Sequence, residues 1–258
     1  MKIVVFVKLV PDLVEELTVD PGGTTLDTTW LRMIINEFDD HAVEQAILLK
    51  EKTSTQVIVI APDFDGVDEV LFTACAKGAD QIIKLTGDFS SINNHALARA
   101  VASRIKILQP DLVLTGVQAN NDIDGSIGPA LAACLNQPFV GYVSGVTLED
   151  NTAIVQKEYP GGVIAEMSIT LPAVLGIQAA EQPPRYVAVS KVRQVMKTSN
   201  IDEQPLDELD NSGFPEVTRM FQSETSAHAE MITGSPDEIA DRLVSVFKEK
   251  GILQRTNR

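Results

Sequence analysis

Residues 116–129 carry the side chains best suited to chemistry, because glycines, amides and acids gather there in one short stretch. An apolar run at 111–115 leads into the stretch, and an amphipathic run at 127–135 leads out of it. This order is typical of a strand, a polar loop and a helix. Such a loop directs several backbone N–H groups toward one point, and the helix N-terminus adds a partial positive charge there. The chemistry that suits this arrangement is phosphate binding.

The side chains of this stretch leave two interpretations open. Its glycines allow tight turns and a close approach of the backbone, while Ser126 can cap the following helix through its hydroxyl. The same features describe an ordinary capped loop between a strand and a helix. Asp122 and Asp124 argue against direct contact with a phosphate, because like charges repel. They fit capping, binding of ribose hydroxyls or exposure to solvent equally well.

The length and charge of the whole chain limit what it can be. Its 258 residues, 44% of them hydrophobic, favour one large domain or one domain with appendages and a sizeable core. The formal net charge of −15 argues against a nucleic-acid or anionic-membrane surface. No apolar run is long enough to span a bilayer, and the N-terminus is predicted to be a strand rather than a signal peptide. We therefore expect a cytoplasmic or matrix-like protein.

Cysteines and histidines indicate neither a metal site nor a catalytic set. Cys75 and Cys134 fall on the apolar faces of predicted helices, so we interpret them as buried hydrophobic residues. The three histidines are scattered along the chain, and no CxxC motif is present. We interpret His41 as a helix-face residue, Asp122 as a polar loop group and Lys157 as a solvated strand residue. No nucleophile and base can be paired from them.

The order of apolar runs predicts an α/β protein with a Rossmann-like, doubly wound parallel sheet and helices on both faces. Predicted strands at 2–7, 56–61, 79–85 and 111–115 alternate with predicted helices at 36–49, 65–77, 90–108 and 127–135. Asn36 or Asp39 is expected to cap the first helix. Ligands of such sheets bind beyond the C-terminal ends of the strands, at the point where strand order reverses. Lys8, the corner at 61–62 and the loop after Gly116 are predicted to share that edge.

The remaining segments are expected to extend this sheet and then leave it. A small hairpin is predicted at 17–27, and antiparallel hairpins are predicted at 146–148, 153–158, 163–170 and 173–178. A basic stretch at 187–197 precedes an aperiodic arm at 199–233, which needs a partner surface if it is ordered. Ser235 and the proline after it start a final helix. We predict a nucleotide-binding α/β domain over 1–198 and a partner-wrapping arm with a C-terminal helix over 199–258.

Several motifs occur together in one order. They are Val-Lys-Leu-Val-Pro-Asp (7–12), Asn-Glu-Phe-Asp-Asp-His-Ala-Val-Glu-Gln-Ala (36–46), Ala-Lys-Gly-Ala-Asp (76–80), Gly-Val-Gln-Ala (116–119) with Gly-Ser-Ile-Gly (125–128), Leu-Pro-Ala-Val (171–174) and Pro-Arg-Tyr (184–186). In this order and spacing the chain resembles the β (small) subunit family of electron transfer flavoprotein. The resemblance runs from about residue 2 to about residue 197 and continues weakly to the last helix.

The resemblance implies a carrier of electrons without catalytic residues of its own. The β subunit of this family forms a heterodimer with an α subunit that holds the redox-active FAD. It binds a second adenine nucleotide, which is AMP in most members and a second FAD in the electron-bifurcating members. Electrons arrive from flavin dehydrogenases, such as acyl-CoA dehydrogenases, and leave toward a quinone reductase. AMP is the expected ligand here, with FAD as the alternative.

The resemblance also implies which residues bind the nucleotide. They are Phe6, Asn36, Glu37, Phe38, Asp39, Pro62, Gly116, Val117, Gln118, Ala119, Asn120, Asn121, Asp122, Ile123, Asp124, Gly125, Ser126 and Ile127. The chain departs from the family pattern at Glu37, where Pro is frequent, and at Ser126, where Gln is frequent. A run of acids is common in the family where residues 120–124 stand. These departures concern the identity of the nucleotide rather than the fold.

A docking loop for dehydrogenases follows the Pro-Arg-Tyr motif in this family. Its anchor, usually Leu, falls on Val189, and its lysine-rich tail is reduced here to Lys191, Arg193 and Lys197. The resemblance therefore implies a dehydrogenase partner that differs from the usual one. The local positive charge on an acidic chain also favours an acidic partner at this segment.

Three other functions compete with the carrier. A hydrolase or ligase of adenine nucleotides carries a Ser-Gly-Gly type phosphate loop after the first strand, where this chain has Lys-Leu-Val-Pro-Asp (8–12). A nucleotide-binding stress protein carries a glycine-spaced loop near its C-terminus, and a nicotinamide dehydrogenase carries GxGxxG after a strand. Neither pattern is present in this sequence.

Overall fold

The structure is a computed structural model of the chain. It describes residues 1–89, 92–122, 125–206, 216–223 and 229–252. The chain divides into two compact units, Met1–Met220 and Phe221–Arg258. The boundary between these units falls inside the segment expected to be an arm, and the predicted division after residue 198 stays a prediction.

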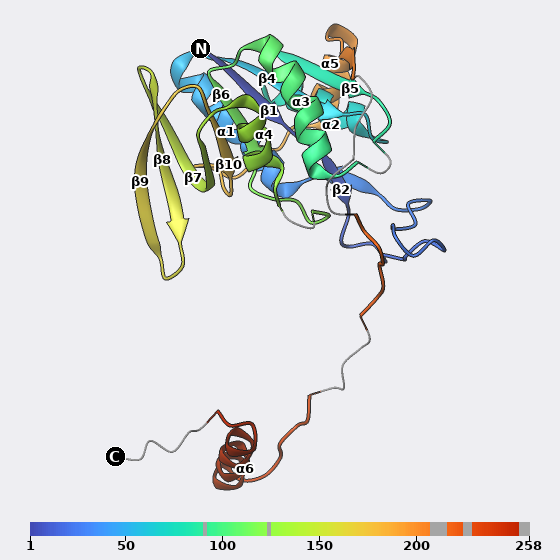
Figure 1. The fold of residues 1–258 in the computed structure, drawn as a ribbon, viewed down its shortest axis with the longest axis vertical. Coiled ribbons are helices and arrows are strands. Elements are labelled where there is room, and N and C mark those ends of the chain that lie inside the picture. The colour runs from blue at the N-terminus through green and yellow to red at the C-terminus, as the bar shows by residue number, and fades with distance from the viewer. Residues whose placement is uncertain (90–91, 123–124, 207–215, 224–228, 253–258) are drawn as a thin grey trace. The chain divides into compact units, whose positions relative to one another are not determined.

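A nine-stranded sheet forms the centre of the first unit, in the order β11-β5-β4-β1-β6-β10-β7-β8-β9 (Figure 1). Its strands are β1 (Lys2–Phe6), β4 (Gln56–Pro62), β5 (Gln81–Thr86), β6 (Leu112–Gly116), β7 (Phe139–Glu149), β8 (Thr152–Tyr159), β9 (Val163–Thr170), β10 (Ala173–Ile177) and β11 (Asp202–Pro205). Neighbours from β11 to β7 pair in parallel, and β7, β8 and β9 pair antiparallel.

Helices cover both faces of the parallel part of the sheet. They are α1 (Glu37–Thr53) and α2 (Val67–Lys77) on one face, and α3 (Asn94–Leu108) and α4 (Ile127–Leu135) on the other. Side chains of β1 alternate between the two layers, with Val5 packed toward α1 and α2 and Val4 toward α3 and α4. A strand buried on both faces reads as a continuous apolar run, which is how the sequence shows it. The predicted doubly wound fold is confirmed.

The segment 173–178 differs from its prediction. It was expected to be part of an antiparallel hairpin, whereas β10 enters the sheet in parallel between β6 and β7, pairing Ala173 with Leu112 and Val174 with Phe139. All five residues of β10 are buried. Full burial requires a neighbouring strand on each side and a helix layer on the faces, which a hairpin at the rim of the sheet does not offer. The antiparallel pairing of β7, β8 and β9 confirms the other predicted hairpins.

The basic stretch expected to be a docking loop is a helix, α5 (Val189–Thr198). Val189, Val192 and Met196 recur at helical spacing, and Val192 packs inward while the other two are exposed. The segment after α5 was expected to be an arm without regular structure, but its first residues form β11, which pairs in parallel with β5. Both differences arise from packing against distant segments, α2 and β5, that local sequence does not reveal.

A short excursion separates β1 from α1. The strands β2 (Leu9–Pro11) and β3 (Met33–Ile35) pair antiparallel, and a bridge between Val19 and Leu26 closes the chain around a turn. The N–H of Gly23 donates to the carbonyl of Asp20 at 2.9 Å within that turn. The hairpin predicted at 17–27 is confirmed.

The second unit contains one helix, α6 (Pro236–Glu249), within its described residues. The helix begins with a capping box, in which the Ser235 hydroxyl accepts from the Glu238 N–H and the Glu238 carboxylate accepts from the Ser235 N–H at 2.8 Å. This bond lowers the pKa of Glu238. The predicted helix start is confirmed. Across the described part of the chain, no helix is long and apolar enough to cross a membrane.

Both cysteines are free thiols, as predicted, but they are half-buried rather than buried. Cys75 of α2 and Cys134 of α4 pack at the margins of the two core layers. The helix face that carries each cysteine is only partly covered, so apolar periodicity overestimated its burial.

Candidate functional site at the strand-end edge

The C-terminal ends of β1, β4 and β6 meet at one edge of the sheet, because the three strands are parallel neighbours. From β1 the chain adds β4 and β5 on one side, and then returns to place β6 on the other side. Strand order therefore reverses between β1 and β6. Open α/β sheets bind ligands at such a reversal, outside the strand ends. Lys8, the end of β4 and the loop after Gly116 share this edge, as predicted.

One carboxylate joins the two strands at the reversal. Asp39, in the first turn of α1, accepts the N–H of Lys8 on Oδ2 at 2.9 Å and the N–H of Gly116 on Oδ1 at 2.8 Å. These amides lie at the points where the chains of β1 and β6 begin to separate, so the sheet no longer pairs them. The side chain of Asp39 takes over from the strand ladder there.

Burial is the main influence on the charge of Asp39, which is 4% exposed. Loss of solvation raises the pKa of its carboxyl to about 7, although the hydrogen bonds from the amides of Lys8 and Gly116 favour the charged form. The capping role expected of Asn36 or Asp39 is wrong, because neither side chain caps α1. The side chain of Asn36 instead donates to the carbonyl of Gln118 at 2.8 Å. The side chains of Asn36 and Asp39 therefore bind backbone groups at and beyond the strand ends, and they do not cap the helix.

Gly116 has no room for a side chain. A Cβ placed there would lie 2.4 Å from Oδ1 of Asp39 and 2.8 Å from Cβ of Phe38. At Gly128 the nearest atom, Cε2 of Phe139, would be 2.9 Å away, while Gly125 has a φ of +58°. The expected close approach and the expected turn are both confirmed. The loop thus lies directly on the start of α1.

Long-range hydrogen bonds hold the first part of the loop. The Val117 N–H donates to the carbonyl of Ile177 at 2.9 Å, and the Asn120 side chain donates to the carbonyl of Pro11 at 3.1 Å. The Ala119 N–H donates to the Asp122 carboxylate at 2.9 Å. The loop is therefore fixed to β10 on one side and to β2 on the other.

Asp122 is paired inside the protein rather than solvated. Its side chain is 2% exposed, forms an ion pair with Lys8 and accepts from the Asn94 side chain at 3.1 Å. Lys8 neutralises the charge of Asp122, one of the two acids that argue against a phosphate at this loop. Sequence reasoning had placed Lys8 at this edge without giving it a role. The signal was a lysine directly after a buried strand, whereas nothing in the sequence singled out Asn94.

The first turn of α4 contains no acidic residue. Ser126 occupies the N-cap position, but its side chain does not cap the helix, so this expectation is wrong. Its φ of −92° and ψ of 0° differ from the extended backbone from which a serine hydroxyl reaches the N2 or N3 amide. The partial positive charge of the helix start is retained. Ile123 and Asp124, two of the predicted site residues, lie outside the described residues.

The remaining predicted nucleotide residues border the same edge in different environments. Phe6 is 1% exposed, with its ring in the core layer toward α3 and α4. Pro62 is buried at the end of β4, Phe38 is half-buried against Gly116, and Glu37 is exposed. The structure thus brings these positions to one edge, while their binding of a nucleotide stays a prediction.

The predicted docking residues are not part of this edge. Val189, Lys191, Arg193 and Lys197 are exposed on α5, which packs against α2. His41 lies on the face of α1 as expected, and its Nδ1 accepts from the Ala180 N–H at 3.2 Å.

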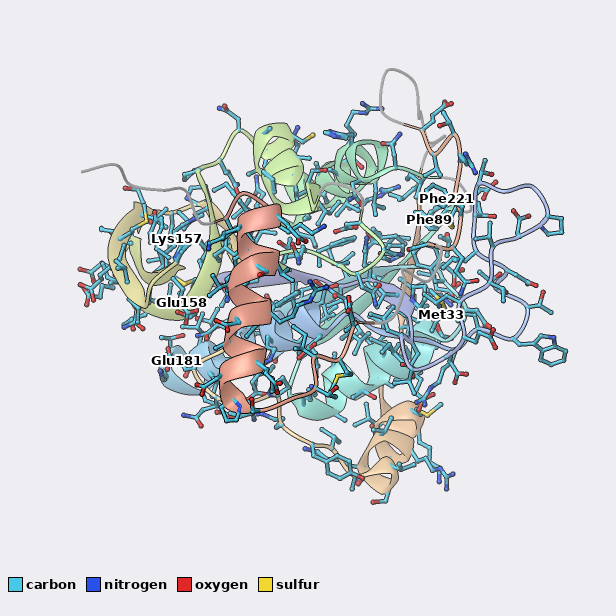
Figure 2. All side chains as sticks on the ribbon, turned by 90° about the horizontal axis from the view of Figure 1, so that it is seen from below. Met33, Phe89, Lys157, Glu158, Glu181 and Phe221 are labelled. Atoms are coloured by element: carbon cyan, nitrogen blue, oxygen red, sulfur yellow. The ribbon has the colours of Figure 1, made fainter. Side chains whose placement is uncertain are left out.

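Lys157 differs from its prediction as a solvated residue. It is half-buried on β8, donates to the carbonyl of Gly141 at 3.0 Å and lies 5.4 Å from the ring centres of Tyr142 and Tyr159 (Figure 2). The carbonyl and the two rings are partners of its ammonium group within the protein.

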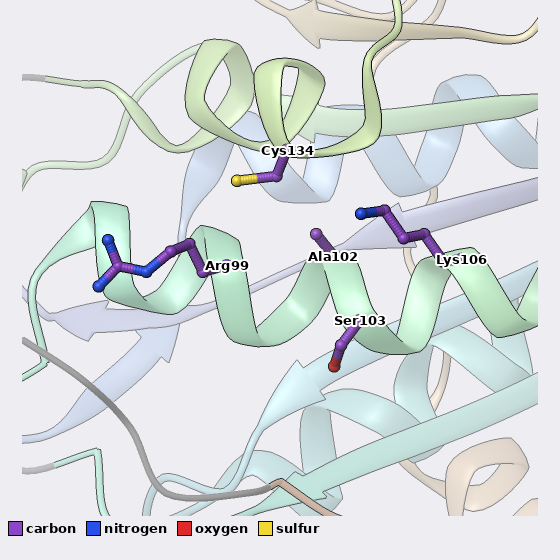
Figure 3. A pocket seen from close by; sticks show the side chains of 5 residues that line it. All are labelled: Arg99, Ala102, Ser103, Lys106 and Cys134. Atoms are coloured by element: carbon purple, nitrogen blue, oxygen red, sulfur yellow. The ribbon is translucent and has the colours of Figure 1, made fainter.

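A surface hollow lies elsewhere, between α3 and α4. Figure 3 shows its lining: Arg99, Ala102, Ser103 and Lys106 from α3, with Cys134 from α4. None of the predicted site residues that the structure describes is among these lining residues. The strand-end edge remains the candidate site, because it combines the strand reversal, the bridging carboxylate and the acid-free helix start.

A doubly wound parallel sheet with helices on both faces defines a protein of the Rossmann-like α/β class. The electron transfer flavoprotein domain family matches residues 24–209. The electron transfer flavoprotein subunit beta of Methylophilus methylotrophus is 31% identical, over 96% of this chain and 98% of its own. The mitochondrial subunit beta of Oryza sativa subsp. japonica is 32% identical, over 94% and 97%. The chain belongs to the electron transfer flavoprotein β-subunit family.

A further relative carries a different name. The caffeyl-CoA reductase-Etf complex subunit CarD of Acetobacterium woodii is 31% identical, over 98% of this chain and 100% of its own length. The likeness in each case extends over nearly the whole chain.

Proposed function

We propose that this chain is the β subunit of a heterodimeric electron transfer flavoprotein whose α subunit holds the redox-active FAD. The heterodimer passes electrons from flavin dehydrogenases, such as acyl-CoA dehydrogenases, toward a quinone reductase. Membership of the β-subunit family supports this role, since the family consists of electron-transfer subunits. The chain itself contributes binding and positioning rather than a catalytic group.

We further propose that AMP binds at the strand-end edge. The observation that carries this proposal is the neutralisation of Asp122 by Lys8 next to the acid-free start of α4. The N–H groups of residues 125–127 and the helix dipole suit the phosphate. The apolar neighbours Phe38 and Pro62 suit a flat adenine. AMP has no redox chemistry of its own, so it would act as a structural ligand.

FAD at the same edge is the second candidate. Glu37 is exposed where the family often has proline, and the relative named from the caffeyl-CoA reductase-Etf complex covers nearly the entire chain. AMP and FAD share the adenosine phosphate half, so the residues named above would serve both. With FAD here, the heterodimer would carry two flavins and belong with the electron-bifurcating members.

The nucleotides released from the purified heterodimer test this proposal. One FAD and one AMP per heterodimer is the expected result, whereas two FAD would overturn AMP in favour of the bifurcating candidate. A heterodimer with FAD alone and no second nucleotide would refute nucleotide binding at this edge.

A matched pair of variants locates the site. Gly125→Asp adds a carboxylate beside the start of α4, and aspartate tolerates the positive φ of this position better than most residues. We expect it to lower the AMP content about tenfold, because a second charge opposes the phosphate. Ser103→Asp, on the exposed face of α3, adds the same charge away from the edge and should leave AMP unchanged. Equal AMP content in both variants would place the nucleotide elsewhere.

We also propose that α5 docks the electron-donating dehydrogenase. Val189 is 60% exposed on this helix, beside the exposed basic side chains Lys191, Arg193 and Lys197. An apolar anchor surrounded by positive charge suits an acidic partner with an apolar hollow. The helical form gives these side chains a fixed arrangement that a loop would lack.

A further inference from the structure

The packing of α5 against α2 depends on little buried surface of the helix. The helix has ten residues, and Val192 is its one buried residue. An isolated helix of this length is marginal in water, and a single buried side chain cannot fix its direction. The flanking segments therefore contribute to the position of α5 beside its contact with α2. Because α5 is the proposed docking element, any role in positioning it for docking rests on that proposed function.

Residues 180–185, which lead into α5, have no regular secondary structure but are tied to α1. Three backbone N–H groups of this segment donate to side chains of α1: Ala180 to His41 Nδ1 (3.2 Å), Glu181 to Gln45 Oε1 (3.1 Å) and Arg185 to Glu44 Oε2 (2.9 Å). Figure 2 marks Glu181 in this segment. The segment follows one face of α1 for several residues without forming a strand or helix.

Arg185 is the strongest of these attachments. Its Nε donates to Oε1 of Glu44 at 2.9 Å, and its Nη1 donates to Oε1 of Glu51 at 2.6 Å. Glu44 and Glu51 stand seven residues apart, on the same face of α1 two turns away from each other. The planar guanidinium can hold both carboxylates at once, which a lysine cannot do in the same geometry.

The two carboxylates differ in exposure. The side chain of Glu44 is 2% exposed, while that of Glu51 is 54% exposed. A buried carboxylate needs a cation to compensate its lost hydration, and Arg185 provides it from side chain and backbone together. The same guanidinium lowers the pKa of Glu51. Arg185 and these two glutamates form a clamp between the leading segment and α1. Glu44 makes the stronger contact in this clamp and Glu51 the weaker one.

The other end of α5 is fixed as well. Three residues after the helix, β11 pairs with β5, and Lys84 of β5 contacts Glu203 at 2.9 Å and Asp68 of α2 at 3.0 Å. Both segments that flank α5 are therefore attached to the first unit, the leading one to α1 and the following one to β5 of the sheet. The two connections are equally short, since residues 186–188 separate Arg185 from α5 and residues 199–201 separate α5 from β11.

We propose that Arg185 is a positioning residue for docking, which fixes α5 by clamping its leading segment onto Glu44 and Glu51 of α1. The clamp acts through α5 and has no contact with the electron donor. Because α1 also carries Asp39 at the strand-end edge, one helix sets the place of both the candidate nucleotide site and the docking helix.

Kinetics and hydrogen exchange of the purified heterodimer test this proposal. In Arg185→Gln we expect backbone amides of 189–198 to exchange about tenfold faster, because the helix loses one of its two anchored flanks. The KM for the donor dehydrogenase should rise about fivefold with kcat within about twofold, as expected for lost binding rather than lost transfer. Arg185→Lys should restore part of the KM, since it keeps the charge but not the two-carboxylate geometry.

Two further variants are controls, one for the loss of an exposed ion pair and one for a failure to fold. Lys52→Gln removes the exposed ion pair with Glu181 on the same segment and should change neither exchange nor KM. If Arg185→Gln does not fold, the double variant Glu44→Gln with Arg185→Gln avoids a buried lone charge and should show the same faster exchange and raised KM.

Unchanged exchange in α5, or unchanged KM with faster exchange, would overturn the positioning role. Val189→Ala, with the clamp intact, distinguishes a failure of the clamp from a failure of docking. If it raises KM while Arg185→Gln does not, the docking helix stands and the clamp inference fails. If neither variant raises KM, α5 is not the docking element and the proposed docking fails with it.

Discussion

The strand-end edge and the C-terminal helices differ in which side chains they bury: the edge buries charged ones, and the helices expose apolar ones. At the edge, Asp39 and Asp122 have buried carboxylates with partners inside the chain. On α5 and α6, apolar side chains such as Val189 and Phe247 are 60% and 40% exposed. Buried charges require partners that the fold provides, whereas exposed apolar groups on a helix face gain by contact with another surface.

This contrast separates residues that matter for folding from residues that matter for association. A substitution at the edge should act on folding first, because it leaves a buried group without its partner. A substitution on the exposed helices should leave folding alone and act on association, because it removes contacts that exist only in a complex. Measurements of stability and of electron transfer test that division.

The pH dependence of Asp39 is expected to have the largest effect. Burial raises its pKa from 3.8 to about 7 in the folded chain. Between these values the unfolded carboxyl is ionised while the folded one keeps its proton, so stability from this group falls as pH rises from about 4 to about 7 and is level above. The change amounts to about 4 kcal/mol in the free energy of unfolding.

Urea unfolding of wild type and Asp39→Asn across this pH window measures that effect. Asparagine does not titrate, so the advantage of the wild type over the variant should shrink toward pH 7. A difference that stays constant from about pH 4 to about pH 8 would show that Asp39 is charged throughout and held by its two amide bonds.

Removal of the cation beside Asp122 should come next. Lys8→Met leaves a carboxylate whose side chain is 2% exposed without its ion pair. We expect a loss of about 3 kcal/mol in the free energy of unfolding, because a broken buried pair leaves an uncompensated charge. Lys52→Met, which breaks an exposed pair with Glu181, should cost less than about 1 kcal/mol. Similar losses in both variants would contradict the contrast between buried and exposed charges.

A side chain at Gly116 should cost somewhat less. Gly116→Ala places a Cβ 2.4 Å from Oδ1 of Asp39, so the loop or the start of α1 must move. We expect a loss of about 2 kcal/mol, typical of overpacking. Gly161→Ala is the control, because nothing lies within 4 Å of its Cβ and only its φ of +84° is strained. Its cost should be about 1 kcal/mol; thermal or urea unfolding compares the two.

Substitutions on α5 should change stability least. Val189→Ala and Lys191→Glu alter exposed side chains, so unfolding should shift by no more than about 0.5 kcal/mol. Electron transfer from the native dehydrogenase should nevertheless slow in both, and the effect of Lys191→Glu should weaken at high salt. Stopped-flow rates and bound cofactor are the measurements. Unchanged rates in both variants would refute docking at α5.

The local parts of the fold were predictable because each depends on neighbouring residues. Apolar runs locate β1, β4 and β6, the predicted helix at 65–77 contains α2, and the polar loop before residue 127 marks the start of α4. The hydrophobic period and the capping residues are encoded within a few positions, so reading them required no knowledge of distant contacts.

The failures share a different cause. The capping role predicted for Asp39 is wrong because its partner, Gly116, lies 77 positions away in sequence. For β10, the uninterrupted apolar stretch was itself a sign of a fully buried strand, but the hairpins before it favoured antiparallel pairing. In α5, apolar residues recur at helical spacing, whereas the loop expected there was implied by the family resemblance.

The late arrival of β11 has a consequence for the chain as it is synthesised. Until residues 202–205 exist, β5 is the outermost strand on its side and presents unpaired N–H and C=O groups to any other chain. Lys84 stands within this strand, between Ile83 and Leu85. A lysine on an open strand opposes pairing with a second molecule. The same ammonium later pairs with Glu203 of the arriving strand, so the residue that discourages aggregation early becomes the one that receives the correct strand.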